Sequence, residues 1–159
     1  MDRAPRPSWL THRWPLAWAA LTAAFALHVL DEATHDFLSW YNPSALRLRE
    51  YLGGLPFPPA FTFPVCLAGL GIAILALAAL TPLVRPGRRW VVIAAYAYGL
   101  VHTANAIAHM AISAAGGWLA PGVLSSPVLL AAALWLVIET TRALNQNPAS
   151  SRGAQEPLR

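Results

Sequence analysis

Four long apolar segments separated by short polar stretches dominate the pattern of this chain. The segments cover about residues 14–39, 60–84, 89–112 and 121–142. Roughly 20 consecutive apolar residues are enough for an α-helix to cross the hydrocarbon core of a bilayer. The pattern therefore predicts an all-α protein, a four-helix transmembrane bundle over residues 14–142.

The stretches outside these segments are polar or rich in turn-forming residues. Residues 1–13 form a lead-in, and residues 143–159 are predicted to be a disordered tail. In the longest connection, 41–59, the sequence SALRLREYL predicts a short interfacial helix, whereas the prolines of LGGLPFPP resist helix. Pro121 suits the first turn of the fourth helix.

Composition and charge agree with a membrane protein. Hydrophobic residues make up 57% of the chain and charged residues 11%, against about 25% charged in typical soluble domains. The formal charge of +4 does not indicate nucleic-acid binding, because all eleven basic residues are arginines placed near the ends of apolar segments. Nine of them lie before the first segment, between the second and third segments, or at and after the end of the fourth. The positive-inside rule then predicts that both termini are cytoplasmic. The expected location is a bacterial inner (plasma) membrane, with membrane lipid as the surrounding partner.

The first segment also has features of a cleavable signal peptide, namely an arginine-bearing start, an apolar core and small residues. Its long apolar stretch and the three segments that follow favour a retained span. The single cysteine, Cys66, excludes an internal disulfide and a multi-cysteine metal site.

The first segment ends in a cluster of four ionisable side chains within eight residues, HVLDEATH. These side chains occupy positions i, i+3, i+4 and i+7, so they share one face of a helix. A charged side chain near the bilayer centre costs roughly 2.5–3.5 kcal/mol on insertion scales. Because of this cost, we expect the cluster to face the interior of the bundle. Its members are His28, Asp31, Glu32 and His35.

The third segment repeats the arrangement in HTANAIAH, with His102, Asn105 and His109 on one face. The first and third helices cross the membrane in the same direction. At about 1.5 Å per residue, His28 lies about 21 Å into its segment and His102 about 18 Å into its own. The two polar faces are therefore predicted to meet at one level in the outer half of the membrane. The matched spacing also suggests duplication of a two-helix unit.

Imidazole and carboxylate side chains together are typical ligands of divalent transition metals, with zinc or iron expected here. Helical bundles build such centres from Glu and His residues about one turn apart on facing helices. The predicted metal ligands are His28, Glu32, His35, His102 and His109. The predicted catalytic residues are Asp31, Glu32 and Asn105. Asp31 or His35 could serve as a general base or orient a ligand.

The same residues leave other interpretations open. Buried histidines can be hydrogen-bonded packing residues, Asn105 can join two helices, and Asp31 with Glu32 can relay protons as in pumps. A carrier of metal ions or protons would need more room than four helices offer unless the protein forms a homodimer. A single haem with axial histidines from the first and third helices is a further alternative.

Three short motifs resemble those of one family. The stretch HVLDE from His28 to Glu32 matches its signature with Asp31 in place of the first Glu, NAIAH from Asn105 to His109 matches its second motif, and WLAPGVLSSP contains its aromatic-x-Pro-Gly turn. This combination is similar to the HXXEE-domain membrane proteins. The resemblance implies four helices and an enzymatic activity of unknown type, and it points to His28, Asp31, Glu32, Asn105, His109 and the Pro121–Gly122 turn. His35 and His102 come from the helical period alone.

The sequence thus predicts a metal-dependent membrane enzyme, a hydrolase or an oxidoreductase, with its site between the first and third helices. A polar site at membrane depth, in a chain with almost no soluble part, predicts a lipid-like or isoprenoid-like substrate. Hydrolysis, oxidation and isomerisation all fit such a site.

Overall fold

The computed structural model describes residues 9–85 and 88–145, which form five α-helices and a short 3-10 turn. The elements are α1 (Trp9–Thr34), α2 (Phe37–Tyr51), α3 (Phe63–Leu80), η1 (Thr81–Leu83), α4 (Arg89–Gly116) and α5 (Ser126–Asn145). No strand occurs in these two ranges. α1, α3, α4 and α5 each contain a stretch long and apolar enough to cross a membrane. The predicted all-α class with four spans is confirmed, whereas most of the predicted lead-in and tail lies outside the described residues.

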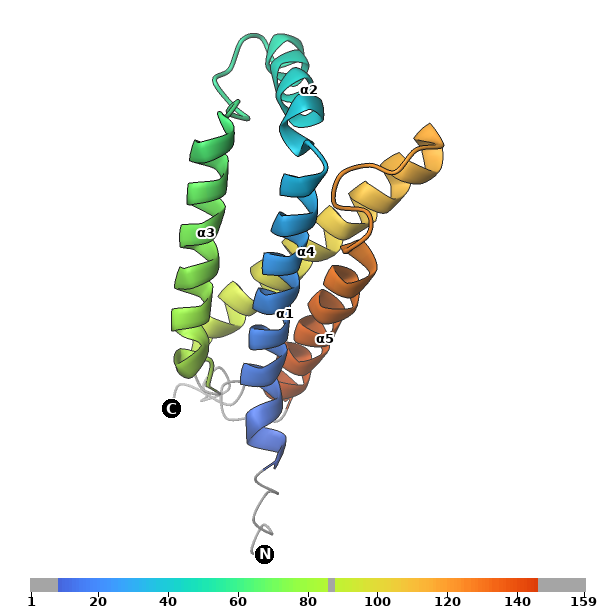
Figure 1. The fold of residues 1–159 in the computed structure, drawn as a ribbon. Helices are drawn as coiled ribbons and strands as arrows, with labels where there is room; N and C mark the ends of the chain where they lie inside the picture. Colours follow the sequence, from blue (N-terminus) through green and yellow to red (C-terminus); the bar gives the residue numbers. More distant parts are fainter. Residues whose placement is uncertain (1–8, 86–87, 146–159) are drawn as a thin grey trace, which may run out of the picture.

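The four long helices run alternately up and down the molecule. The start of α1, the connection from α3 to α4 and the end of α5 lie at one end (Figure 1). α2 and the loop that leads to α3 lie at the opposite end. The first and last described helices therefore begin and end on the same side of the bundle.

The core lies where α5 packs against both α1 and α4. Small residues allow this close approach, because a side chain without bulk lets two backbones come together. Gly99 of α4 is an example, since a Cβ added there would lie 2.7 Å from Val137 Cγ2 of α5. Larger side chains fill the remaining space. The fully or almost fully buried core residues include Trp14, Ala17, Trp18, Leu21, Ala95, Leu129, Ala133 and Leu136.

α3 stands at the side of the bundle, next to α1 (Figure 1). None of its residues is buried inside the molecule, although its span is the most apolar of the four. One anchor to α1 is the hydrogen bond from Trp18 Nε1 to the Leu77 carbonyl, at 2.8 Å. An apolar helix with so little protein cover is suited to contact with lipid along its length.

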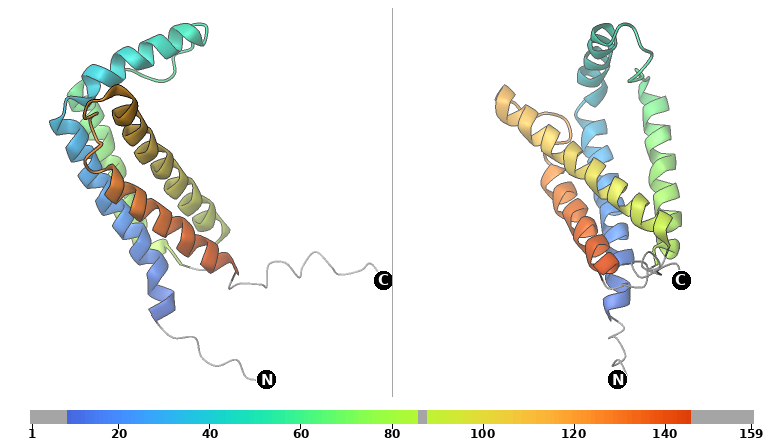
Figure 2. Two further views of the ribbon diagram at one scale, coloured as in Figure 1. Left: turned by 90° about the vertical axis from the view of Figure 1, so that its right-hand side faces the viewer. Right: turned by 180° about the vertical axis from the view of Figure 1, so that it is seen from behind.

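The first helix ends earlier than the predicted residue 39. α1 stops at Thr34, and Asp36 adopts a left-handed conformation with φ 52°. Asp tolerates this region better than most residues with a side chain. The Thr34 hydroxyl also donates to the Leu30 carbonyl at 2.9 Å, within the last turn of α1. The chain changes direction here, and α2 projects from the end of the bundle (Figure 2, left).

α2 and the loop that returns to α3, residues 37–62, form what we call the arm. The predicted short helix is real but longer, since α2 has 15 residues. The loop is held against α2 by Asn42, which exchanges two hydrogen bonds with the Phe61 backbone at 2.9 and 3.0 Å. Tyr41 donates to the Pro59 carbonyl at 3.1 Å, and burial raises the pKa of its phenol. The arm is therefore held together by its own hydrogen bonds.

The connection between the last two helices also differs from the prediction. α4 continues to Gly116 and ends at Gly117 with φ 65°, a left-handed C-cap that favours glycine. α5 begins only at Ser126. The expectation that Pro121 opens the last helix is wrong, because Gly122 follows with φ 83° and keeps the chain in a turn. This turn, residues 117–125, is thus available to cover the site described below.

Replacing Gly99 should separate α4 from α5. In Gly99→Ala the new methyl would meet Val137 Cγ2 at 2.7 Å and the Ala133 carbonyl oxygen at 3.3 Å, and such overpacking costs about 1–3 kcal/mol. Gly69→Ala in α3 is the matched control, because nothing lies within 4 Å of its Cβ position. Both variants gain the same helix propensity. Unfolding in detergent should show Gly99→Ala less stable than Gly69→Ala, and equal stabilities would contradict the close packing.

Candidate metal centre

The site begins with two residues one turn apart near the end of α1. His28 and Glu32 occupy positions i and i+4 and point to the same side of the helix. Both are buried, His28 completely. Their close approach, 3.5 Å from His28 Nε2 to Glu32 Oε1, places an imidazole and a carboxylate side by side in an apolar helix.

α4 supplies the third member. His109 is also buried, and its Nε2 lies 3.2 Å from Glu32 Oε1. One carboxylate oxygen thus faces an imidazole nitrogen from each of two helices. The imidazole rings of His28 and His109 meet nearly edge to face, with their centroids 4.9 Å apart. These three residues are drawn from two helices that make little other direct contact with each other.

The geometry of this group suits a metal ion. The ligand atoms of His28, Glu32 and His109 all lie within 4.8 Å of one another. Ligands at about 2.0–2.1 Å from a tetrahedral zinc ion are about 3.3 Å from each other, close to the two N–O distances here. A donor set of two histidines and one glutamate occurs in catalytic zinc sites, and two histidines with one carboxylate also bind non-haem iron.

Asn105 lies beside the group on α4, one turn before His109. Its Nδ2 is 3.0 Å from His28 Nε2. The amide therefore contacts the ring nitrogen that would bind a metal. It both joins α1 to α4 and lies at the edge of the candidate centre.

The backbone of the turn between α4 and α5 covers the group. A Cβ built on Gly122 would lie 2.7 Å from His28 Cε1 and 3.1 Å from both Glu32 Cγ and His109 Cε1. No side chain fits between this backbone and the three candidate ligands. The positive φ of Gly122 imposes the same choice of residue. The glycine of this Pro-Gly turn is therefore explained by the site that it covers.

Ser125, in the same turn, is a residue that the sequence did not reveal as part of the site. Its backbone N–H and its hydroxyl both donate to Asp31 Oδ2 at 2.8 Å. Its Oγ also lies 2.9 Å from His28 Nδ1. A serine at the start of a helix is common as a cap, so the sequence offered no specific signal.

The structure brings some of the predicted residues together and leaves others apart. His28, Glu32, Asn105 and His109 converge, and Asp31 reaches His28 only through Ser125. His35 has a side chain 46% exposed and pairs with Asp31 Oδ1 at 3.0 Å. His102 is buried one level deeper, where its ring packs on Phe25 with centroids 4.5 Å apart. Neither His35 nor His102 is in the ligand group.

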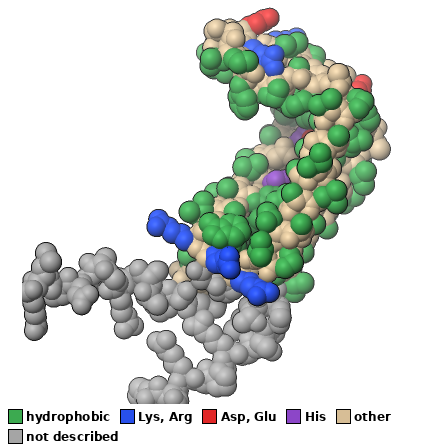
Figure 3. Space-filling view, turned by 90° about the vertical axis from the view of Figure 1, so that its left-hand side faces the viewer, with side chains coloured by type: hydrophobic (Ala, Val, Ile, Leu, Met, Phe, Trp, Pro, Cys, Tyr) green, Lys and Arg blue, Asp and Glu red, His purple; other side chains and the backbone are tan. Residues whose placement is uncertain are grey.

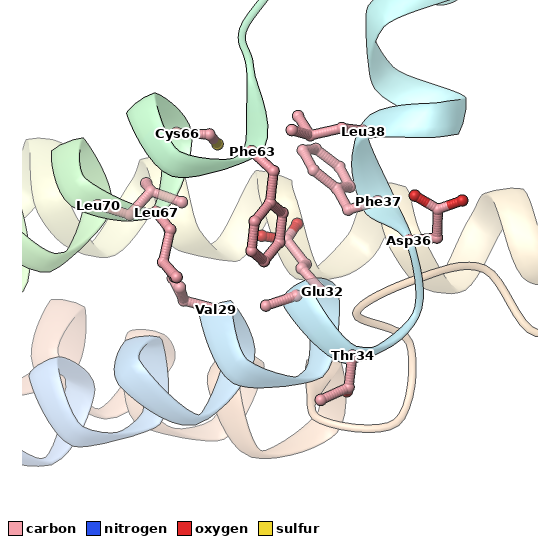
Figure 4. A pocket seen from close by; sticks show the side chains of 11 residues that line it. Val29, Glu32, Thr34, Asp36, Phe37, Leu38, Phe63, Cys66, Leu67 and Leu70 are labelled. Atoms are coloured by element: carbon pink, nitrogen blue, oxygen red, sulfur yellow. The ribbon is translucent and has the colours of Figure 1, made fainter.

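An apolar cavity of about 220 Å³ lies on the other side of Glu32. It is partly open and is lined by the end of α1, the start of α2 and the first half of α3, and Glu32, Phe37 and Phe63 converge on it (Figure 4). Its remaining walls are mostly apolar. They are formed by Val29, Ala33, Thr34, Asp36, Leu38, Cys66, Leu67 and Leu70.

A hollow in the surface leads toward the same level of the bundle. It lies beneath the projecting arm, and histidine side chains are visible in it among hydrophobic ones (Figure 3). Both buried histidines of α4 retain slight exposure, 8% for His102 and 5% for His109. The site is therefore buried but close to the surface on the side of the arm.

Comparison with known proteins identifies a family and no reaction. A family model described as a protein of unknown function with HXXEE motif matches residues 18–136. The match begins within α1, includes His28 to Glu32, and ends about halfway along α5. No curated protein and no solved structure matches the chain.

Gly122→Ala should disrupt the site more than its conformation alone explains. The new Cβ would collide with the rings of His28 and His109, which adds an overpacking cost of about 1–3 kcal/mol to the left-handed strain. Gly117→Ala is the control, because its φ is +65° but nothing lies within 4 Å of its Cβ position. Unfolding measurements should rank Gly122→Ala clearly below Gly117→Ala. Equal losses would mean that the turn does not press on the histidines.

Proposed function

The chain belongs to the HXXEE family, whose description names no reaction, and we propose that it is a metal-dependent integral membrane enzyme. In this proposal His28, Glu32 and His109 bind one divalent transition metal, zinc or iron. The lipid-like or isoprenoid-like substrate enters the cavity beside Glu32. The arginine distribution supports cytoplasmic termini, and the membrane in this proposal is a bacterial plasma membrane.

One observation carries the proposal. Glu32 belongs at once to the three-residue ligand group and to the wall of the apolar cavity. A substrate whose hydrocarbon chain occupied this cavity would bring its polar end to the ligand group. The lining by Val29, Phe63, Leu67 and Leu70 favours a hydrocarbon chain, and the exposed side of α3 gives such a chain access from the lipid.

The residues around the proposed metal would have different roles in the reaction. Three protein ligands leave an open position on a catalytic metal, which would polarise a substrate oxygen or activate water. Asn105 is placed to orient a polar group beside His28 Nε2. The turn at Gly122 excludes water from one side of the group, since backbone fills the space against both imidazoles.

The identity of the metal separates the two main reaction classes. A zinc ion bound by two histidines and a glutamate supports hydrolysis, whereas a non-haem iron held by two histidines and a carboxylate supports oxidation. A single haem is less favoured, because Glu32 lies between the two Nε2 atoms and the Gly122 backbone packs on both rings.

Metal analysis of the purified protein tests the proposal directly. We expect stoichiometric zinc or iron in the wild type. Glu32→Gln and His109→Ala should lose most of it. Losing a residue that only orients a ligand typically weakens metal binding 10–100-fold, and losing a ligand itself should weaken binding further. His35→Gln is the matched control, since this histidine directly follows α1 and lies outside the ligand group. A metal-free wild type whose stability is unchanged by a chelator would refute the proposal.

A second test fills the cavity without touching the ligands. Cys66→Trp should lower photolabelling by a photoreactive fatty acid several-fold, because the indole would occupy space beside Glu32. Metal content should stay at the wild-type level. Leu75→Trp, on the same helix at a side chain 70% exposed, should change neither. Undiminished labelling of Cys66→Trp would show that the probe binds elsewhere.

A further inference from the structure

A continuous series of hydrogen bonds connects the turn before α5 to the candidate metal ligand of α1. Asp31 Oδ2 accepts the backbone N–H and the hydroxyl of Ser125, both at 2.8 Å. Ser125 Oγ in turn lies 2.9 Å from His28 Nδ1. Ser125 is buried, and no buried side-chain polar atom among the described residues lacks a partner.

The chemistry of these groups fixes the direction of each bond. An ionised carboxylate can only accept hydrogen bonds, whereas a serine hydroxyl has a single proton to donate. When that proton is directed to Asp31 Oδ2 at 2.8 Å, or to the Gly122 carbonyl oxygen at 3.1 Å, the Ser125 oxygen can only accept from His28. In this arrangement His28 carries a proton on Nδ1.

A second contact agrees with the same tautomer. The Asn105 amide, oriented with its Nδ2 group toward the ring, can only donate, and it lies 3.0 Å from His28 Nε2. Nε2 accepts this bond with its lone pair, and the Glu32 carboxylate oxygen is farther from the same nitrogen, at 3.5 Å. Two residues on different elements, Ser125 and Asn105, thus agree on one state of His28.

We propose that Ser125, held by Asp31, is a positioning residue that fixes the tautomer and orientation of His28 so that Nε2 presents its lone pair to the metal. Its role toward a metal depends on the proposed function, but the tautomer does not. Histidines that bind metals commonly donate their other ring N–H to an oxygen acceptor, which sets the tautomer and raises ligand basicity. When a metal binds Nε2, the Asn105 amide has to leave this nitrogen, so Ser125 would be the contact that remains.

The tautomer can be measured on the metal-free wild-type protein. Long-range nitrogen–proton correlation spectra of the full chain, labelled at histidine nitrogen, report which ring nitrogen is protonated. Comparison with His28→Gln assigns the signals. We expect a proton on Nδ1 of His28 and a lone pair on Nε2. A proton on Nε2, or on both nitrogens, would overturn the inference.

The effect on metal binding is measured by cobalt(II) titration followed in the visible spectrum. Ser125→Ala should weaken binding about 10–100-fold, whereas Ser125→Thr, which keeps a hydroxyl, should bind within a few-fold of wild type. Ser126→Ala is the matched control. Ser126 is also buried, and its hydroxyl donates to the Gly122 carbonyl at 2.7 Å, away from His28.

The outcomes distinguish this inference from the proposed function. If Ser125→Ala binds cobalt with unchanged affinity and spectrum, the positioning role is wrong and the metal centre stands. If Ser126→Ala weakens binding as much as Ser125→Ala, the effect belongs to the turn in general, and the role of Ser125 is again wrong. A wild type that binds no cobalt would refute the proposed function and, with it, any role of Ser125 toward a metal.

Discussion

The upper half of the bundle depends on a buried carboxylate that lies between two imidazoles. Glu32 is only 8% exposed, and an ionised group taken out of water without partners would cost several kcal/mol. His28 and His109 approach the same oxygen at 3.5 and 3.2 Å. The nearer imidazole, that of His109, is a polar partner that offsets part of this cost. This requirement brings the end of α1 to α4 at a level where the two helices otherwise have little direct packing.

The rest of the architecture accommodates this group by closing it with backbone. Small residues such as Gly99 bring α4 close to α5 in the lower half. Above that level the chain leaves α4 at Gly117 and returns across the site at Gly122 before α5 begins. A side chain larger than hydrogen at Gly122 would occupy the space of the candidate ligands. The late start of α5 leaves room for this turn over the site. The apolar pattern of the sequence does not predict this late start.

The sequence could predict the helices and the polar stripes but not how each stripe is used. Hydrophobic length was sufficient for the four spans, and helical spacing placed His28 with Glu32 and Asn105 with His109. An arc of about 100° is broad, however, so residues at its ends can point elsewhere. His35 lies just after the end of α1, beside Asp36 in its left-handed conformation. Ser125 could not be found because its role depends on a turn whose path only the fold defines.

The side chains of the two adjacent acidic residues, Asp31 and Glu32, point in different directions, and the contacts of the first one suit an aspartate. Neighbouring residues on a helix point about 100° apart, so Glu32 faces α4 while Asp31 faces the turn before α5. Asp31 accepts from a backbone N–H, whose position is set by the turn rather than by a flexible side chain. A glutamate at this position would be longer by a methylene and would have to fold back to keep both 2.8 Å bonds to Ser125. The two adjacent carboxylates of this chain therefore make different contacts, and the shorter side chain fits a turn that lies close to α1.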